Sequence, residues 1–165
     1  MHSGQRKSIE QFYKAETWYG RVGKSQRVLK GFNFTGSEIR GWTLERSRRE
    51  ESGNVVITRS MWRRGESTNE VLAVDVFECA SVKAAHDQVI EALGNMESNA
   101  IKRQSRSNTV GDVHFTLDDT MSLFARANVV TLIRNAGPVV VKVSAIARQV
   151  DSLILRLLKF TGKQR

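Results

Sequence analysis

The sequence predicts an α+β fold in which an antiparallel sheet carries two long helices packed on it. One observation is that short alternating or apolar runs, separated by turn residues, recur along most of the chain. A second is that residues 82–96 and 143–158 space their apolar side chains three and four positions apart, as amphipathic helices do. A third is the order of elements, because three predicted strands precede each helix. Together these observations favour a two-layer sandwich or a half-barrel.

The first unit, residues 42–96, begins with a predicted β-hairpin. Residues 42–49 and 55–63 have strand-like alternation and flank a polar turn. Residues 71–77 are almost continuously apolar, as expected of a central strand. Ser81 is a favourable N-cap for the helix that follows.

The second unit, residues 112–160, repeats this order. Three short strands are predicted at residues 113–117, 121–126 and 129–133. The helix after them has the strongest apolar stripe in the chain, formed by Val143, Ile146, Ala147, Val150, Leu153, Ile154, Leu157 and Leu158. The repeated β-β-β-α order suggests a structural duplication.

A chain of 165 residues has the size of one domain, so residues 1–165 are predicted to form a single unit. Residues 1–40 precede the sheet as an N-terminal extension and cover. Within them, residues 8–18 are predicted to form a short helix capped by Ser8. The single cysteine, Cys79, excludes an internal disulfide and is expected to act as a small buried hydrophobe.

The chain is strongly basic, with a formal net charge of +9 and an isoelectric point of about 10.2. Such a charge attracts nucleic acid, anionic lipid and acidic proteins without selecting among them. No apolar run approaches the roughly 20 residues that span a bilayer, so no transmembrane segment is predicted. The start of the chain lacks the apolar region of a signal peptide. The expected location is the cytoplasm by default, or outside it if a leader has been removed.

Three motifs of the second unit follow a common pattern. Gly111-Asp112-Val113-His114-Phe115 opens a short strand, Phe124 to Ile133 forms a strand pair, and Ile146 to Asp151 lies in the final helix. This pattern resembles uncharacterised bacterial domains and, among them, the PsbP-like α+β sandwich family, whose members are lipoproteins, sensor ectodomains or chaperones of secreted proteins. Ala127 stands where we expect glycine in this pattern. The resemblance covers residues 111–151 and implies a binding or scaffold module, and it carries over no catalytic residue.

The predicted hairpin is rich in arginine. Alternation places Arg46 and Arg48 on one face of their strand. It places Arg59 and Arg63 on one face of the partner strand. If the register aligns these faces, four guanidinium groups gather beside Trp62, which suits phosphates or stacked bases.

This basic patch has a candidate extension and a competing interpretation. Lys102 and Arg103 lie in a predicted basic loop over residues 97–111 and could extend it. The competing interpretation is a solvated face on which acidic residues pair with the arginines across strands. The candidates for such pairing are Glu45, Glu50, Glu51 and Glu66.

A candidate chemical site begins the second unit. Asp112 and His114 share a strand face and Asp119 follows in the next turn, so an acid–base or metal site can be considered. The competing interpretation is structural, since strand residues two apart are always neighbours and Asp is common in turns. His86 is expected to be exposed on the first long helix. No ligand spacing predicts a metal site, and no motif implies a cofactor.

The sequence does not specify the function, and it orders three hypotheses. The first is a non-enzymatic binding or interaction module that holds a protein segment or small apolar ligand on the sheet face or beside the last helix. The alternative is binding of nucleic acid or another polyanion through the basic hairpin. The second alternative is an enzyme with Asp112, His114 and Asp119 in its active site. Pairing of two copies into a homodimer is compatible with each.

Overall fold

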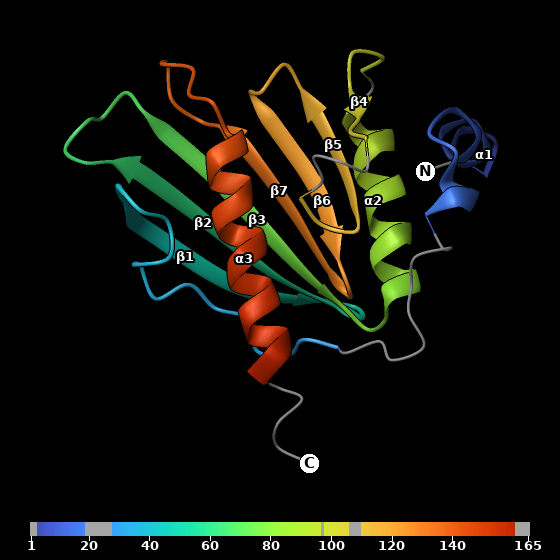
Figure 1. Ribbon diagram of the computed structural model, residues 1–165, viewed down its shortest axis with the longest axis horizontal. Coiled ribbons are helices and arrows are strands. Elements are labelled where there is room, and N and C mark those ends of the chain that lie inside the picture. The colour runs from blue at the N-terminus through green and yellow to red at the C-terminus, as the bar shows by residue number, and fades with distance from the viewer. Residues whose placement is uncertain (1–2, 19–27, 97, 106–109, 161–165) are drawn as a thin grey trace.

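The computed structural model describes residues 3–18, 28–96, 98–105 and 110–160 (Figure 1). Within these residues lies one sheet of seven strands in the order β1-β2-β3-β7-β6-β5-β4, and every neighbouring pair is antiparallel. The strands are β1 (Trp42–Ser52), β2 (Val55–Arg64), β3 (Val71–Cys79), β4 (Lys102–Arg103), β5 (Val113–Leu117), β6 (Met121–Arg126) and β7 (Val129–Asn135). Two meanders, β1-β2-β3 and β5-β6-β7, meet where β3 pairs with β7. The predicted α+β class is confirmed.

The helices among the described residues are α1 (Ser3–Phe12), α2 (Val82–Met96) and α3 (Ser144–Phe160), and a 3-10 turn, η1 (Ala15–Thr17), follows α1. The cap of α2 is the predicted one, because the Ala84 N–H donates to Ser81 Oγ at 3.1 Å. The predicted start of the first helix is wrong: Ser8 lies inside α1, where its hydroxyl donates to the Gly4 carbonyl. None of the helices in this described part has the length and hydropathy needed to span a bilayer.

The two long helices pack on opposite faces of the sheet. Val74 and Phe124 belong to one core together with Ile154 of α3. Leu123 belongs to a second core together with Val89 of α2. Because successive strand residues point to opposite faces, the two cores lie on either side of the sheet. The molecule therefore has three layers instead of the predicted two, with α3 crossing the middle of one face (Figure 1).

The β-β-β-α order occurs twice among the described elements. If the two units were related by a two-fold axis, the antiparallel pairing of β3 with β7 would require that axis to be normal to the sheet. Both helices would then lie on the same face of the sheet. The observed helices lie on opposite faces. The duplication therefore remains a prediction.

Residues 28–41, here called the cover segment, close the α3 side of the first meander without forming a helix or strand. Phe32, Phe34 and Ile39 from this segment are buried in the α3 core. The Asn128 side chain accepts from the Leu29 N–H at 2.7 Å and donates to the Leu29 carbonyl at 2.9 Å. These two hydrogen bonds satisfy the backbone N–H and C=O of Leu29, which have no partner strand.

Candidate functional site

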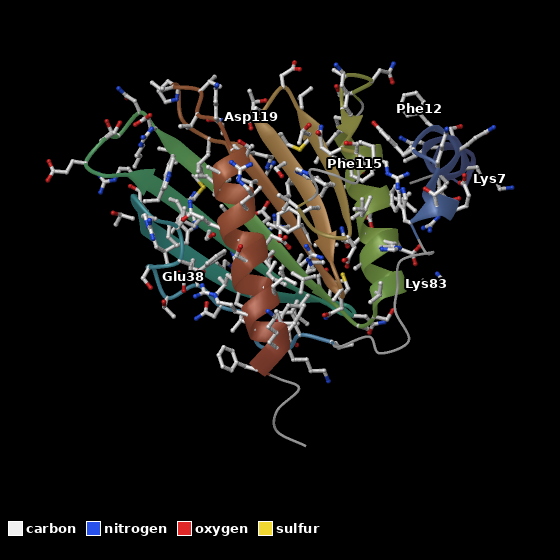
Figure 2. All side chains as sticks on the ribbon, viewed as in Figure 1. Lys7, Phe12, Glu38, Lys83, Phe115 and Asp119 are labelled. Atoms are coloured by element: carbon white, nitrogen blue, oxygen red, sulfur yellow. The ribbon has the colours of Figure 1, made fainter. Side chains whose placement is uncertain are left out.

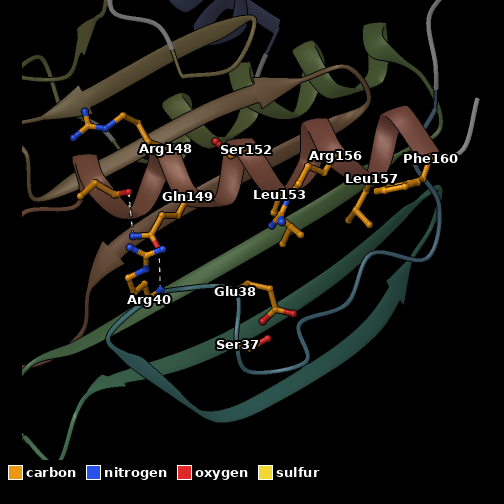
Figure 3. A pocket seen from close by; sticks show the side chains of 11 residues that line it. Ser37, Glu38, Arg40, Arg148, Gln149, Ser152, Leu153, Arg156, Leu157 and Phe160 are labelled. Carbon is orange, nitrogen blue, oxygen red and sulfur yellow. Dashed lines mark hydrogen bonds between the residues drawn. The ribbon is translucent and has the colours of Figure 1, made fainter.

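A groove runs along α3 beside the cover segment and has a volume of about 770 Å³ (Figure 3). Its helical wall contains Ala145, Arg148, Gln149, Ser152, Leu153, Arg156, Leu157 and Phe160. Most of these residues are three or four positions apart, so they form one face of α3. The adjoining face of the helix is the stripe buried in the core, which includes Val150 and Ile154.

The cover segment forms the second wall of this groove. The backbone N–H of Arg40 donates to Gln149 Oε1 at 2.8 Å, which ties the two walls together at one end. Glu38, the one acidic residue among the lining residues, accepts from the backbone N–H groups of Thr35 at 2.6 Å and Gly36 at 2.9 Å. Burial of Glu38 opposes ionisation, but these hydrogen bonds outweigh it and lower its pKa. The Glu38 carboxylate is thus hydrogen-bonded by the backbone of the cover segment.

The cations of the groove are not neutralised in this way. Arg40, Arg148 and Arg156 line it, and none of them forms an ion pair with any residue of the described ranges. Figure 3 shows Arg156 and Leu153 pointing from α3 toward the cover segment. Phe160, at the end of the groove, is 67% exposed. The groove therefore combines free guanidinium groups with an apolar strip.

A second surface lies on the other side of the sheet, over the first meander, and is here called the open sheet face. In its first row, Arg46 of β1 faces Met61 of β2, Met61 faces Ala73 of β3, and Ala73 faces Arg134 of β7. The second row contains Arg48, Arg59, Asp75 and Leu132, in the same strand order. A hollow of about 390 Å³ lies over these rows.

The arginine-bearing faces of the hairpin therefore align, with Arg48 directly opposite Arg59. Arg63 lies further along the same face of β2, where its Nε is 3.1 Å from Glu45 Oε1. Glu50 contacts Arg59 at 2.9 Å and Arg48 at 3.6 Å. Pairing with Glu45 and Glu50 thus agrees in part with the interpretation of a solvated, mutually compensated face.

Asp75 is the buried acid of this surface, with a side chain that is 6% exposed. Its Oδ2 lies 2.8 Å from Arg134 Nη2 and 3.7 Å from Arg59 Nη1. Arg46, at the edge of the hollow, has no ion-pair partner within the described ranges, and the Arg48 side chain is 81% exposed. The β1 side of the hollow therefore keeps accessible positive charge.

Trp62 does not belong to this surface. It is fully buried in the α3 core, where its ring packs edge-on against Phe34 at a centroid distance of 5.2 Å. Its indole Nε1 donates to Ser60 Oγ at 2.9 Å. The predicted aromatic platform beside the arginines is wrong, because strand alternation sends Trp62 and Arg63 to opposite faces.

Lys102 and Arg103 are also separate from the hairpin. They form β4, the opposite edge of the sheet from β1, so five strand spacings of roughly 4.8 Å separate β2 from β4. Arg103 Nη1 donates to Thr17 Oγ1 at 2.7 Å and to the Tyr13 carbonyl at 3.3 Å. The predicted loop is thus partly a strand whose arginine anchors η1, and residues 106–109 of that loop lie outside the described ranges.

The structure does not bring Asp112, His114 and Asp119 together as an active site. Asp112 lies at the start of β5, where it accepts from Arg126 at 2.9 Å and from the Ala127 N–H at 2.7 Å. Asp119 lies beyond the other end of β5 and accepts from the Ser144 N–H at 2.9 Å, which caps α3 (Figure 2). Both acids therefore have structural partners.

His114 lies between them and is buried, with 6% exposure. Its Nε2 is hydrogen-bonded to Ser122 Oγ at 2.9 Å. Burial lowers its pKa to about 4, against the opposing effect of the Asp151 charge. Among residues that the structure describes, no cluster of three or more His, Cys, Asp or Glu could hold a metal ion. Burial also raises the pKa of the Cys79 thiol to about 12, so this thiol is not activated.

Sequence reasoning missed several residues of both surfaces. Asp75 reads as part of an apolar strand, and Arg134 follows a run of apolar residues in the second unit. Only the pairing of β3 with β7 brings them together. Arg40 and Arg156 carry no local signal either. The first hypothesis did place a ligand beside the last helix, but it named no residue of the groove.

Comparison of the chain with protein-family models, curated proteins and solved structures finds no match in any of the three.

Proposed function

We propose that this chain is a non-enzymatic binding module whose groove beside α3 holds a segment of another protein that is both acidic and apolar. The observation that carries the proposal is the charge of the groove. Its three arginines have no ion-pair partner in the described part of the chain, while its one carboxylate is bound by the cover segment. Carboxylates of a partner would supply the missing pairing.

The dimensions of the groove favour a protein segment over a small apolar ligand. Its helical wall runs from Ala145 to Phe160, which is about 22 Å at the rise of an α-helix. An extended segment of about seven residues has this length. Leu153, Leu157 and Phe160 give apolar side chains of the segment a surface to cover, and the arginines favour a segment with acidic side chains. The resemblance of residues 111–151 to PsbP-like domains points in the same direction, toward a binding or scaffold module.

The test uses a fluorescein-labelled peptide of alternating Glu and Leu residues and measures its anisotropy with the full chain. We expect saturable binding that Arg40→Gln/Arg156→Gln weakens by about tenfold, because two charge-assisted contacts are removed. The matched control is Arg46→Gln/Arg48→Gln, which removes the same charge from the opposite face and should leave the affinity within about twofold. Phe160→Ser should weaken binding several-fold while leaving the unfolding transition unchanged, since Phe160 is exposed.

Equal losses in the two double variants would overturn the proposal, because the affinity would then reflect only the net charge. A Lys–Leu peptide of the same length that bound equally well would overturn it too. Sedimentation of the free chain as a dimer that Phe160→Ser dissociates, without peptide binding, would assign this groove to a second copy of the chain instead.

A further inference from the structure

We infer that the open sheet face binds single-stranded nucleic acid through its phosphates, at a site separate from the groove. The arrangement of charge is the first reason. Arg48 and Arg59 lie directly opposite each other on neighbouring strands, where like charges repel. Glu50 contacts both guanidinium groups, and Asp75 also contacts Arg59, but four arginines line the hollow with only these two carboxylates. Phosphates at this position supply the missing anions.

The buried carboxylate of Asp75 is the second reason. It lies beneath the hollow and contacts Arg134 from β7 and Arg59 from β2, so it fixes two guanidinium groups that come from different strands. Both arginine side chains remain about half exposed, at 48% and 49%. A guanidinium has five N–H donors, so each group keeps donors that face solvent. Arginines held in this way lose less conformational freedom when they bind an anion.

The shape of the face is the third reason. Arg46 and Arg48 stand on the β1 side of the hollow and Arg134 on the β7 side, three strand spacings or about 14 Å apart. Between them the floor consists of Met61 and the small Ala73. A single strand can place its phosphates against the arginine walls and a sugar or base on this floor.

The remaining features of the face favour nucleic acid over a membrane. The large apolar side chains exposed in the described part of the chain are Phe12, Val139, Val140, Leu155 and Phe160, and none of them lines the hollow. Within the described residues, the face therefore exposes no large apolar side chain that would insert into lipid. Trp62 is buried in the α3 core and offers no ring for stacking. Binding should therefore depend mainly on the backbone of the strand and only weakly on its sequence.

The experiment measures the anisotropy of a fluorescein-labelled oligothymidine with the full chain over a range of salt concentrations. We expect the affinity to fall as salt rises, and Arg46→Gln/Arg48→Gln to lower it by about tenfold at low salt. Loss of two phosphate contacts should also reduce the slope of log K against log salt by about 1.4. The matched control, Arg40→Gln/Arg156→Gln, removes the same charge from the other face and should change the affinity by less than about twofold.

A second variant separates shape from charge. Ala73→Leu fills the floor of the hollow without altering any charge and should weaken binding several-fold, with its folding checked by thermal unfolding. Equal losses in the two double variants, or no binding at low salt, would overturn the proposal. Binding to phosphatidylserine vesicles that needs Arg46 and Arg48, in the absence of oligonucleotide binding, would also overturn it and assign the face to a membrane surface.

Discussion

At the residue scale, His114 owes its neutral form to its surroundings. It packs against Phe124 in the interior, keeps one hydrogen bond to Ser122, and has a pKa lowered to about 4 by burial. Its Nδ1 has no hydrogen-bond partner within the described part of the molecule. A proton on this ring would therefore introduce a buried charge with little compensation.

This pKa predicts a loss of stability in mild acid. Between about pH 6.5 and pH 4 the unfolded chain binds a proton at His114 that the folded chain does not, so the free energy of unfolding falls as the pH falls. The stability that neutral His114 contributes is fully present above pH 6.5. We expect a decrease of about 2 kcal/mol between roughly pH 7.5 and pH 5. Urea unfolding at both pH values measures it.

The control for this prediction is His114→Gln, whose free energy of unfolding should depend less on pH over the same interval. His86 also has a pKa lowered mainly by burial, so some pH dependence should persist in the variant. A variant with the same pH dependence as the parent chain would contradict the assignment to His114.

Single residues are also where the sequence predicted least. His86 was expected to be exposed, yet it is buried, with Trp18 packed edge-on at 5.9 Å from its ring. Trp18 directly follows η1 and lies nearly 70 residues earlier in the chain, so no local pattern contains that contact. At Ala127, in contrast, the structure explains an expectation from the sequence. Its φ of 52° lies in the left-handed region that favours glycine, which accounts physically for the glycine expected there.

At the element scale, α3 is held to the sheet by an apolar stripe and by one ion-pair network. Arg126 of β6 binds both carboxylate oxygens of Asp151 at 2.8 Å and also contacts Asp112 at 2.9 Å. Burial of Arg126 disfavours its charged form, but Asp151 and Asp112 outweigh this effect and raise its pKa. The network therefore fixes the helix over β6 in one orientation.

Replacement of Asp151 should be strongly destabilising. We expect Asp151→Asn to lower the free energy of unfolding by about 2 to 4 kcal/mol, because the side chain is 10% exposed and Arg126 would keep only its contact with Asp112. The matched control is Arg64→Gln, which breaks the exposed Arg64–Glu70 pair and should cost less than about 1 kcal/mol. Chemical denaturation compares the two, and a change below 1 kcal/mol for Asp151→Asn would show that the network is dispensable.

Elements were the level at which the sequence was most informative. The predicted strands at residues 113–117 and 121–126 coincide with β5 and β6, because alternation and turn residues are local signals. β4 was missed because two basic residues in a polar stretch contain no such signal. The faces of the sheet could not be predicted, since the side on which each helix packs depends on contacts between distant strands.

At the scale of the whole molecule, the two proposed binding surfaces lie on opposite sides of one sheet. The groove belongs to the α3 side and the open sheet face to the other, and their lining residues do not overlap. Both are basic, so the net charge of +9 alone would attract the same ligands to either.

This arrangement predicts that the two surfaces act independently. We expect the Glu–Leu peptide to bind with unchanged affinity when the oligothymidine is saturating, because distant sites without shared partners are usually additive. Anisotropy of the labelled peptide with and without unlabelled oligonucleotide measures this. Competition between the two ligands would instead indicate one common electrostatic site.

The central pairing of β3 with β7 also has a consequence for how the protein is made. Every residue pair between these two strands is separated by about 50 positions or more, so the first meander leaves the ribosome before its partner exists. At 5–20 residues per second, β3 waits for about 3 to 13 seconds with one edge unpaired. During that interval the nascent chain exposes its most apolar strand, and this is when a chaperone would be of most use to it.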